Sequence, residues 1–209
     1  MLLLGPDSRG PQSYYVGKMA DPQDPLDLNL WLDSDLVRRQ NLLKRQFVGI
    51  LEEVANATSN FELAKISQRS RGSKISKGND LLGLPYQVLD LIRDFDSFDG
   101  VNIRLLNWFG NGFFITALMG KNRESLSERF LEEGFSFGLS ENKWDYPDLI
   151  LNKNQTDNPE TIEASDLGFH LWIKPFEILA DSASNVASLR EEVKKILGIL
   201  QVPSEQSRN

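Results

Sequence analysis

Apolar side chains recur every three or four residues near both ends of the chain, and this spacing predicts amphipathic helices. The first helix is expected over residues 34–56, where Leu36 and Phe47 lie on the apolar side and Ser34 is placed to cap the start. A last helix is expected over residues 186–200, with its apolar stripe packed on a sheet.

Between these helices, apolar runs bounded by turn residues predict β-strands. The expected strands are residues 86–92, 101–109, 113–119, 136–139 and 167–174. Pro175 is expected to end the last strand. The order of helices and strands predicts an α+β protein with a mostly antiparallel sheet, a long N-terminal helix and a C-terminal helix packed on the sheet.

The segment Gly110-Asn-Gly112 joins two of these strands and predicts a tight hairpin, because Asn-Gly favours two-residue turns. We expect Asn111 and Gly112 to form the turn with positive φ. Cross-strand partners then count outward symmetrically, which places Trp108 opposite Ile115. Both faces of this hairpin are apolar, so we expect Trp108 to be buried and each face to be covered by another layer.

Two segments later in the chain have weaker patterns. Ser125 and Glu128 have the spacing of a capping box, which predicts a short helix that ends before Gly134. Residues 141–159 are expected to be mostly irregular.

The length of 209 residues is enough for one domain with a full core, and no linker-like segment interrupts its middle. We expect a single α+β domain over residues 29–202. Residues 1–28 are rich in Gly and Pro and predict a disordered tail, in which Met19 is the expected natural start. Residues 203–209 are expected to be a frayed C-terminus.

The composition excludes several classes of protein. The absence of cysteine excludes disulfides, thiolate nucleophiles and Cys-type zinc sites, and it favours a reducing cytoplasm. The longest uncharged run, residues 105–120, is too short and too polar to span a membrane, so no membrane role is expected. The net charge of −7 argues against general nucleic-acid binding, because affinity for a polyanion depends on positive charge.

Positive charge is nevertheless concentrated in residues 65–77, which contain five Lys and Arg residues and no acid. We interpret this stretch as a basic loop on an acidic body. It is either a site for a small anion or an acidic protein partner, with Lys74 and Lys77 as ligands, or a solvated connector. The glycines at 72 and 78 do not have the spacing of a Walker-type phosphate loop.

No motif for a cofactor or a metal is present. Residues 94–100 resemble the start of a calcium loop, but Phe98 occupies a ligand position and Leu105 replaces the closing glutamate. We therefore interpret residues 94–100 as an acidic turn, and no metal and no cofactor are expected.

Two ionisable residues are candidates for chemistry. His170 is the only histidine, so any His-dependent catalysis would have to be built around it. Asp90 lies in a predicted strand, where a half-buried carboxylate needs a hydrogen-bond donor. The candidate donors are Lys74, Arg93 and Arg104. Asp90 is interpreted either as a functional acid or as a structural strut.

Three segments resemble the core of a small family of uncharacterised bacterial cytoplasmic proteins: Lys74-Ile-Ser-Lys-Gly78, Gly83-Leu-Pro-Tyr86 followed by Leu89-Asp90, and Trp108-Phe-Gly-Asn111 with Phe113. The resemblance covers roughly residues 34–200, and its specific part is residues 74–120. The chain departs from the family pattern at Leu91-Ile92, where the family has Tyr-Pro, and at Phe109, where it has a second Trp. The resemblance implies no activity.

Two functions of different classes follow. The first is a non-enzymatic binding or interaction module with weak anion affinity; its expected ligand-binding residues are Lys74, Lys77, Asp90, Arg93, Trp108 and Asn111. The alternative is a small hydrolase or transferase acting on an anionic metabolite, with Asp90, Arg104 and His170 as catalytic candidates. Convergence of these three side chains on a concave site favours the enzyme. An Asp90 sealed beneath Tyr86 and Trp108 favours the module.

Overall fold

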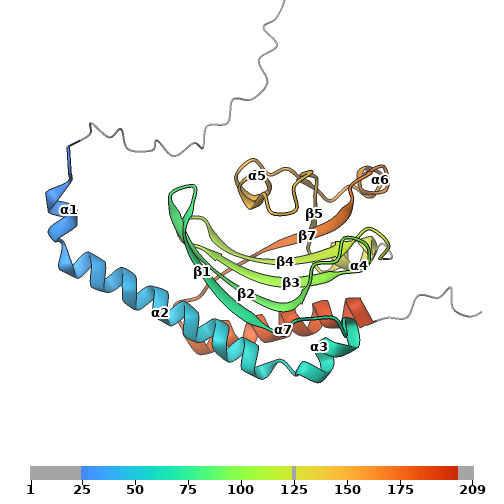
Figure 1. Ribbon diagram of the computed structural model, residues 1–209, viewed down its shortest axis with the longest axis horizontal. Helices are drawn as coiled ribbons and strands as arrows, with labels where there is room; N and C mark the ends of the chain where they lie inside the picture. The colour runs from blue at the N-terminus through green and yellow to red at the C-terminus, as the bar shows by residue number, and fades with distance from the viewer. Residues whose placement is uncertain (1–24, 124–125, 202–209) are drawn as a thin grey trace, which may run out of the picture.

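The computed structural model describes residues 25–123 and 126–201 (Figure 1). Within these ranges the strands form one seven-stranded sheet in the order β1-β2-β3-β4-β7-β5-β6, and all neighbouring strands are antiparallel. The strands are β1 (Lys74–Leu81), β2 (Leu84–Asp94), β3 (Val101–Trp108), β4 (Gly112–Gly120), β5 (Ser136–Gly138), β6 (Gln155–Thr156) and β7 (Phe169–Phe176). The predicted α+β class and antiparallel sheet are confirmed.

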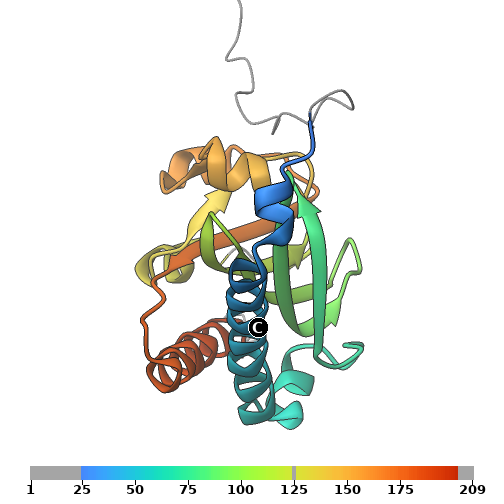
Figure 2. The same ribbon diagram turned by 90° about the vertical axis from the view of Figure 1, so that its left-hand side faces the viewer.

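Both faces of the sheet are covered. The helices are α1 (Leu28–Leu32), α2 (Ser34–Ala57), α3 (Asn60–Ile66), α4 (Ser127–Glu132), α5 (Tyr146–Leu151), α6 (Pro159–Glu163) and α7 (Ser182–Gln201). Figures 1 and 2 show α2 and α7 side by side under one face, with α5 and its flanking loops over the other. The long N-terminal helix and the C-terminal helix packed on the sheet are therefore present as predicted.

Each covered face has its own apolar core. The larger core lies between the sheet and α2, α3 and α7, and it contains Leu51, Leu105 and Ile196 at no exposure. The smaller core lies under α5 and contains Leu106 and Leu149. Because side chains alternate along a strand, neighbouring residues such as Leu105 and Leu106 contribute to opposite cores.

The hairpin between β3 and β4 differs from the predicted one. Trp108 pairs with Gly112, so the turn contains three residues, and the Asn111 N–H donates to the Trp108 carbonyl at 2.9 Å. Positive φ occurs at Gly110 (88°) and Gly112 (121°) but not at Asn111. The predicted pairing of Trp108 with Ile115 is wrong, because strands that are apolar on both faces do not fix their own register. Trp108 is fully buried, as predicted.

Several predicted element boundaries also change. Asp33, not Ser34, caps α2, since its carboxylate accepts the Leu36 N–H at 2.8 Å. Pro175 does not end β7 but pairs with Phe114, a position where β5 no longer flanks β7 and a missing N–H donor is tolerated.

Residues 141–159, predicted to be irregular, contain α5 and β6. Asp145 caps α5 by accepting the Asp148 N–H at 3.2 Å, and Pro147 suits the first turn of that helix. The predicted capping residue Ser125 lies outside the described residues, and α4 begins at Ser127 without a side-chain cap. Met19, most of the predicted tail and residues 203–209 also lie outside them.

Candidate functional site

The most polar buried cluster lies on the face of the sheet under α5. Asp90 and Arg104 are cross-strand partners on β2 and β3. Arg104 Nε and Nη2 donate to the two Asp90 oxygens at 2.7 and 3.1 Å, and Asn102 Nδ2 donates to the first of these oxygens at 3.0 Å. Asp90 is only 5% exposed, and these three hydrogen bonds satisfy both of its oxygens inside the protein.

The loop before α5 closes over Arg104. Arg104 Nη1 lies 3.2 Å from the Tyr146 hydroxyl, and the guanidinium carbon lies 4.9 Å from the centre of a Trp144 ring. Burial disfavours the charged form of Tyr146 and raises the pKa of its hydroxyl above the ordinary value. Burial also disfavours the charge on Arg104, but the attraction of Tyr146 and Asp90 is stronger and raises the pKa of Arg104 overall. Arg104 therefore joins the sheet to the layer above it.

The three candidate catalytic residues do not converge. His170 lies on β7 with its ring 6.1 Å from that of Phe137, and it alternates with Leu171, which belongs to the core under α5. His170 therefore faces the side of the sheet opposite to Asp90 and Arg104. Burial lowers the pKa of His170, which favours the neutral imidazole. Asp90 is closed off by Arg104 and Asn102, which leaves it no free oxygen for acid–base work.

Tyr86 and Trp108 do not seal Asp90, so the arrangement that would favour the module is not present in this form; both side chains hold the neighbouring hairpin. A Cβ added to Gly78 would overlap the Tyr86 ring, so that ring lies over the β1 backbone. Trp108 Nε1 donates to the Leu81 carbonyl at 3.2 Å. Both aromatic residues therefore anchor β1 to the sheet.

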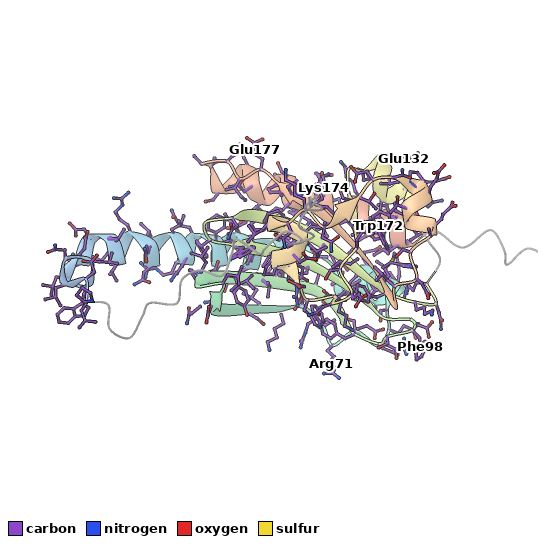
Figure 3. All side chains as sticks on the ribbon, turned by 90° about the horizontal axis from the view of Figure 1, so that it is seen from above. Arg71, Phe98, Glu132, Trp172, Lys174 and Glu177 are labelled. Atoms are coloured by element: carbon purple, nitrogen blue, oxygen red, sulfur yellow. The ribbon has the colours of Figure 1, made fainter. Side chains whose placement is uncertain are left out.

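The basic segment is not a single loop. Lys65 lies in the last turn of α3 and pairs with Glu62, whereas Arg69 lies 3.4 and 3.7 Å from Asp94 and Asp96. Arg71 is exposed and points away from the body (Figure 3). The prediction of a basic loop over residues 65–77 is wrong at both ends, because α3 extends to Ile66 and β1 begins at Lys74.

Lys74 and Lys77 lie on opposite faces of β1. Lys74 is the cross-strand partner of Asp90 and shares the face under α5. Lys77 pairs with Gln87, whose side-chain amide donates to the Lys44 carbonyl of α2 at 2.9 Å. The two lysines therefore do not form one anion site, because three residues along a strand reverse the face.

Lys77 instead lines a groove of about 480 Å³ between α2 and the β1–β2 hairpin. We call this cavity the α2–β1 groove; its charged residues are Lys44, Arg45, Glu52 and Lys77, and its amide side chains are Asn41, Asn79 and Gln87. Within the described ranges, Lys44, Arg45 and Lys77 form no ion pair. Of these charged residues, only Lys77 was expected as a ligand from the sequence.

The remaining expected ligand residues lie elsewhere. Arg93 is half-buried and pairs with Asn102, and its backbone N–H donates to Ser70. Trp108 is buried, and Asn111 is in the hairpin turn. The expected set is thus divided between two faces and a turn.

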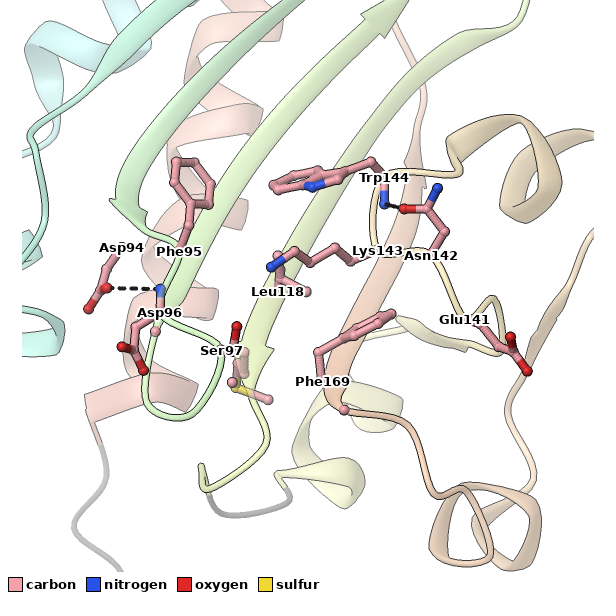
Figure 4. Close-up of a pocket in the computed structure, with 14 residues that line it drawn as sticks. Asp94, Phe95, Asp96, Ser97, Leu118, Glu141, Asn142, Lys143, Trp144 and Phe169 are labelled. Atoms are coloured by element: carbon pink, nitrogen blue, oxygen red, sulfur yellow. Dashed lines mark hydrogen bonds between the residues drawn. The ribbon is translucent and has the colours of Figure 1, made fainter.

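A second cavity, of about 320 Å³, lies between the β2–β3 turn and the loop before α5 (Figure 4). Phe95, Trp144 and Phe169 line it, and the Lys143 ammonium lies 5.6 Å from a Trp144 ring. Asp96 also borders it, but its carboxylate accepts the N–H groups of the turn that it caps, as expected for an acidic turn. Ser97 also lines the cavity, but none of the side-chain hydrogen bonds of the described residues joins its hydroxyl to a base.

Metal ligands are not gathered anywhere in the described part of the chain, where no group of three or more His, Asp or Glu side chains is suitably arranged. None of the helices described there is long and apolar enough to cross a membrane. No family model, curated protein or solved structure matches the chain. The family resemblance of residues 74–120 stays a prediction.

Proposed function

We propose that the chain is a non-enzymatic binding module of the cytoplasm, and that the α2–β1 groove holds an anionic group of its partner. The observation that carries the proposal is the convergence of Lys44, Arg45 and Lys77 on one cavity, where none of the ion pairs of the described residues neutralises them. Helix and strand backbones position all three residues, so the site does not depend on a loop.

The groove favours weak binding. Glu52 lies in the same cavity and offsets one of its three positive charges. Arg45 and Lys77 are exposed, and salt screens exposed charges. Asn41 and Asn79 can donate hydrogen bonds to oxygens of an anion. A small oxyanion or a carboxylate-rich segment of an acidic protein has this chemistry.

The hydrolase or transferase alternative gains no comparable support. It needs Asp90, Arg104 and His170 at one concave site, and His170 faces the other side of the sheet. The carboxylate of Asp90 is also fully hydrogen bonded.

Titration with inorganic phosphate and with poly-glutamate at low salt tests the proposal. We expect saturable binding that weakens steeply as salt is added. Lys44→Gln/Lys77→Gln should abolish it. Lys74→Gln/Arg71→Gln removes the same charge outside the groove and should leave binding nearly unchanged.

The proposal fails if the parent protein binds neither ligand, or if both double variants weaken binding equally. In the second case the net charge of the chain, and not the groove, would be responsible. Unfolding curves of both variants provide the check on folding.

A further inference from the structure

The N-terminal residues 26–43, here called the arm, have no side chain that is buried by the other described residues. Figures 1 and 3 show α1 and the first half of α2 projecting beyond the sheet. Helix α1 has no buried residue, and the buried residues of α2 begin only at Ile50. A helix as short as α1, with five residues, is not stable in water on its own.

The arm also concentrates exposed apolar surface. Of the fourteen large apolar side chains that are exposed in the described residues, eight lie in the arm: Leu26, Leu28, Leu30, Trp31, Leu32, Val37, Leu42 and Leu43. Trp31 is 73% exposed and Leu32 is 68% exposed. Because monomeric proteins rarely expose large apolar surfaces, this concentration of apolar side chains indicates an interaction surface.

At its base the arm meets an apolar hollow of about 270 Å³. Leu43 and Phe47 of α2 form one wall, and Phe109, Phe176 and Ile178 contribute to the other. The apolar surface of the arm therefore continues into a cavity that can receive large side chains.

The acids of the arm precede its bases along the chain, and the two groups meet in one exposed ion pair between Arg38 and Asp35 at 3.2 Å. Asp27, Asp33 and Asp35 are the only charged residues in the N-terminal half, residues 26–35. Arg38 and Arg39 are the only charged residues in the other half, residues 36–43. An arm that meets an identical arm in antiparallel orientation places acids against bases, whereas a parallel pair places like charges together.

We propose that the arm is a homodimerisation element that packs antiparallel against the arm of a second copy of this chain. The contact is isologous, because the same surface is used by both copies. In this orientation the α1 segment of each copy lies toward the base of the other arm, where Leu43 borders the apolar hollow. The proposal is independent of the α2–β1 groove, which the apolar residues of the arm do not line.

Light scattering coupled to gel filtration tests the assembly. The full chain should elute with twice its mass of 23.7 kDa, and Leu32→Glu/Leu43→Glu should elute as a monomer. Phe61→Glu is the matched control, because it removes a 71% exposed apolar side chain of α3 outside the arm and should leave the dimer intact. A monomeric parent at the highest soluble concentration, or a dimer that survives Leu32→Glu/Leu43→Glu, overturns the proposal.

Cross-linking tests the orientation, because the chain has no cysteine of its own. A mixture of Leu28→Cys and Leu42→Cys chains should form a disulfide-linked dimer under oxidation, and each variant alone should not, because residues 28 and 42 lie near opposite ends of the arm and face each other in this antiparallel pair. Efficient cross-linking of each variant with itself would show a parallel pair and contradict the antiparallel arrangement.

Charge reversal gives an independent check. Arg38→Glu/Arg39→Glu should weaken the dimer, as should Asp35→Lys, and mixing the two variants should restore it. Asp27 and Asp33 are left unchanged, because they cap α1 and α2. Failure of the mixture to associate, while the parent remains dimeric, would overturn the charge complementarity.

Discussion

Arg104 and Asp90 form a two-point ion pair across the β2–β3 ladder, at 2.7 and 3.1 Å, with side chains only 14% and 7% exposed. Such a pair is costly to break because the remaining partner keeps its charge in a buried site. We predict that Arg104→Met lowers the free energy of unfolding by about 3–5 kcal/mol.

The double variant Asp90→Leu/Arg104→Met is the informative comparison. It removes both charges, so its loss should be smaller than the sum of the two single losses. Urea unfolding followed by circular dichroism measures all three. Additive losses would show that the two side chains act separately.

A second ion pair joins the sheet to α7. Lys174 Nζ lies 2.6 Å from Glu192 Oε2, and both side chains are mostly buried. Burial opposes the charge on Glu192, but hydrogen bonds from Lys174 and Lys195 lower its pKa overall. We predict that Lys174→Met costs about 1 kcal/mol of unfolding free energy after allowance for solvent screening.

The control for this prediction is Lys194→Met on the same helix. Lys194 pairs with Glu191 at 2.7 Å, but both side chains are more than 60% exposed, so no measurable loss is expected. Thermal unfolding distinguishes the two cases. Equal melting temperatures for the two variants would contradict a stabilising role of the Lys174 pair.

His170 makes stability depend on pH in one direction. Burial lowers its pKa in the folded protein below the value of about 6.5 that applies in the unfolded chain. As the pH falls, the unfolded chain therefore binds the proton first, and the unfolding free energy decreases through pH 6.5 and toward the folded pKa.

Because His170 is the only histidine, a His170→Gln variant isolates this effect. We predict that the variant loses less stability than the parent between about pH 7.5 and 5.5. Urea unfolding at the two ends of this range measures the difference. Parallel losses in both proteins would place the pH dependence elsewhere.

Gly112 tests the observed hairpin. Its φ of 121° strains any residue with a side chain, although the nearest atoms to an added Cβ are 3.6 Å away, in the Phe114 ring. We predict that Gly112→Val lowers the free energy of unfolding by about 1–3 kcal/mol. Gly49→Ala in α2, where nothing lies within 4 Å, should instead gain about 0.4–1 kcal/mol. A Gly112→Val protein that unfolds like the parent would contradict the strain.

The sequence predicted the elements better than their pairing. Periodicity located α2 and α7 because each has a single apolar stripe, and five of the seven strands were found from their apolar runs. Strands β1 and β6 were missed because β1 is mostly polar and β6 has only two residues. The β3–β4 register was missed because Leu105 and Leu106 face two different cores, so either register buries apolar side chains. Helix α5 was missed because its cap, Asp145, and its first-turn Pro147 also suit an irregular loop.

The candidate site was less predictable than the fold. Arg104 was one of the three donors expected for Asp90, and the two residues are cross-strand partners because both lie in predicted strands. The α2–β1 groove was not foreseen, because Lys44 and Lys77 are 33 positions apart and meet only when α2 packs beside β1. Convergence of this kind depends on tertiary packing, which a single sequence does not display.

Strand β1 ends the sheet, and no strand of the described residues pairs with its outer side. A free edge of eight residues is a template on which another extended chain can assemble into fibrils. Lys74 and Lys77 are exposed on opposite faces of this edge, so an added strand would have to desolvate a charge on either side. The charges that were expected to attract a ligand thus also protect the protein from aggregation.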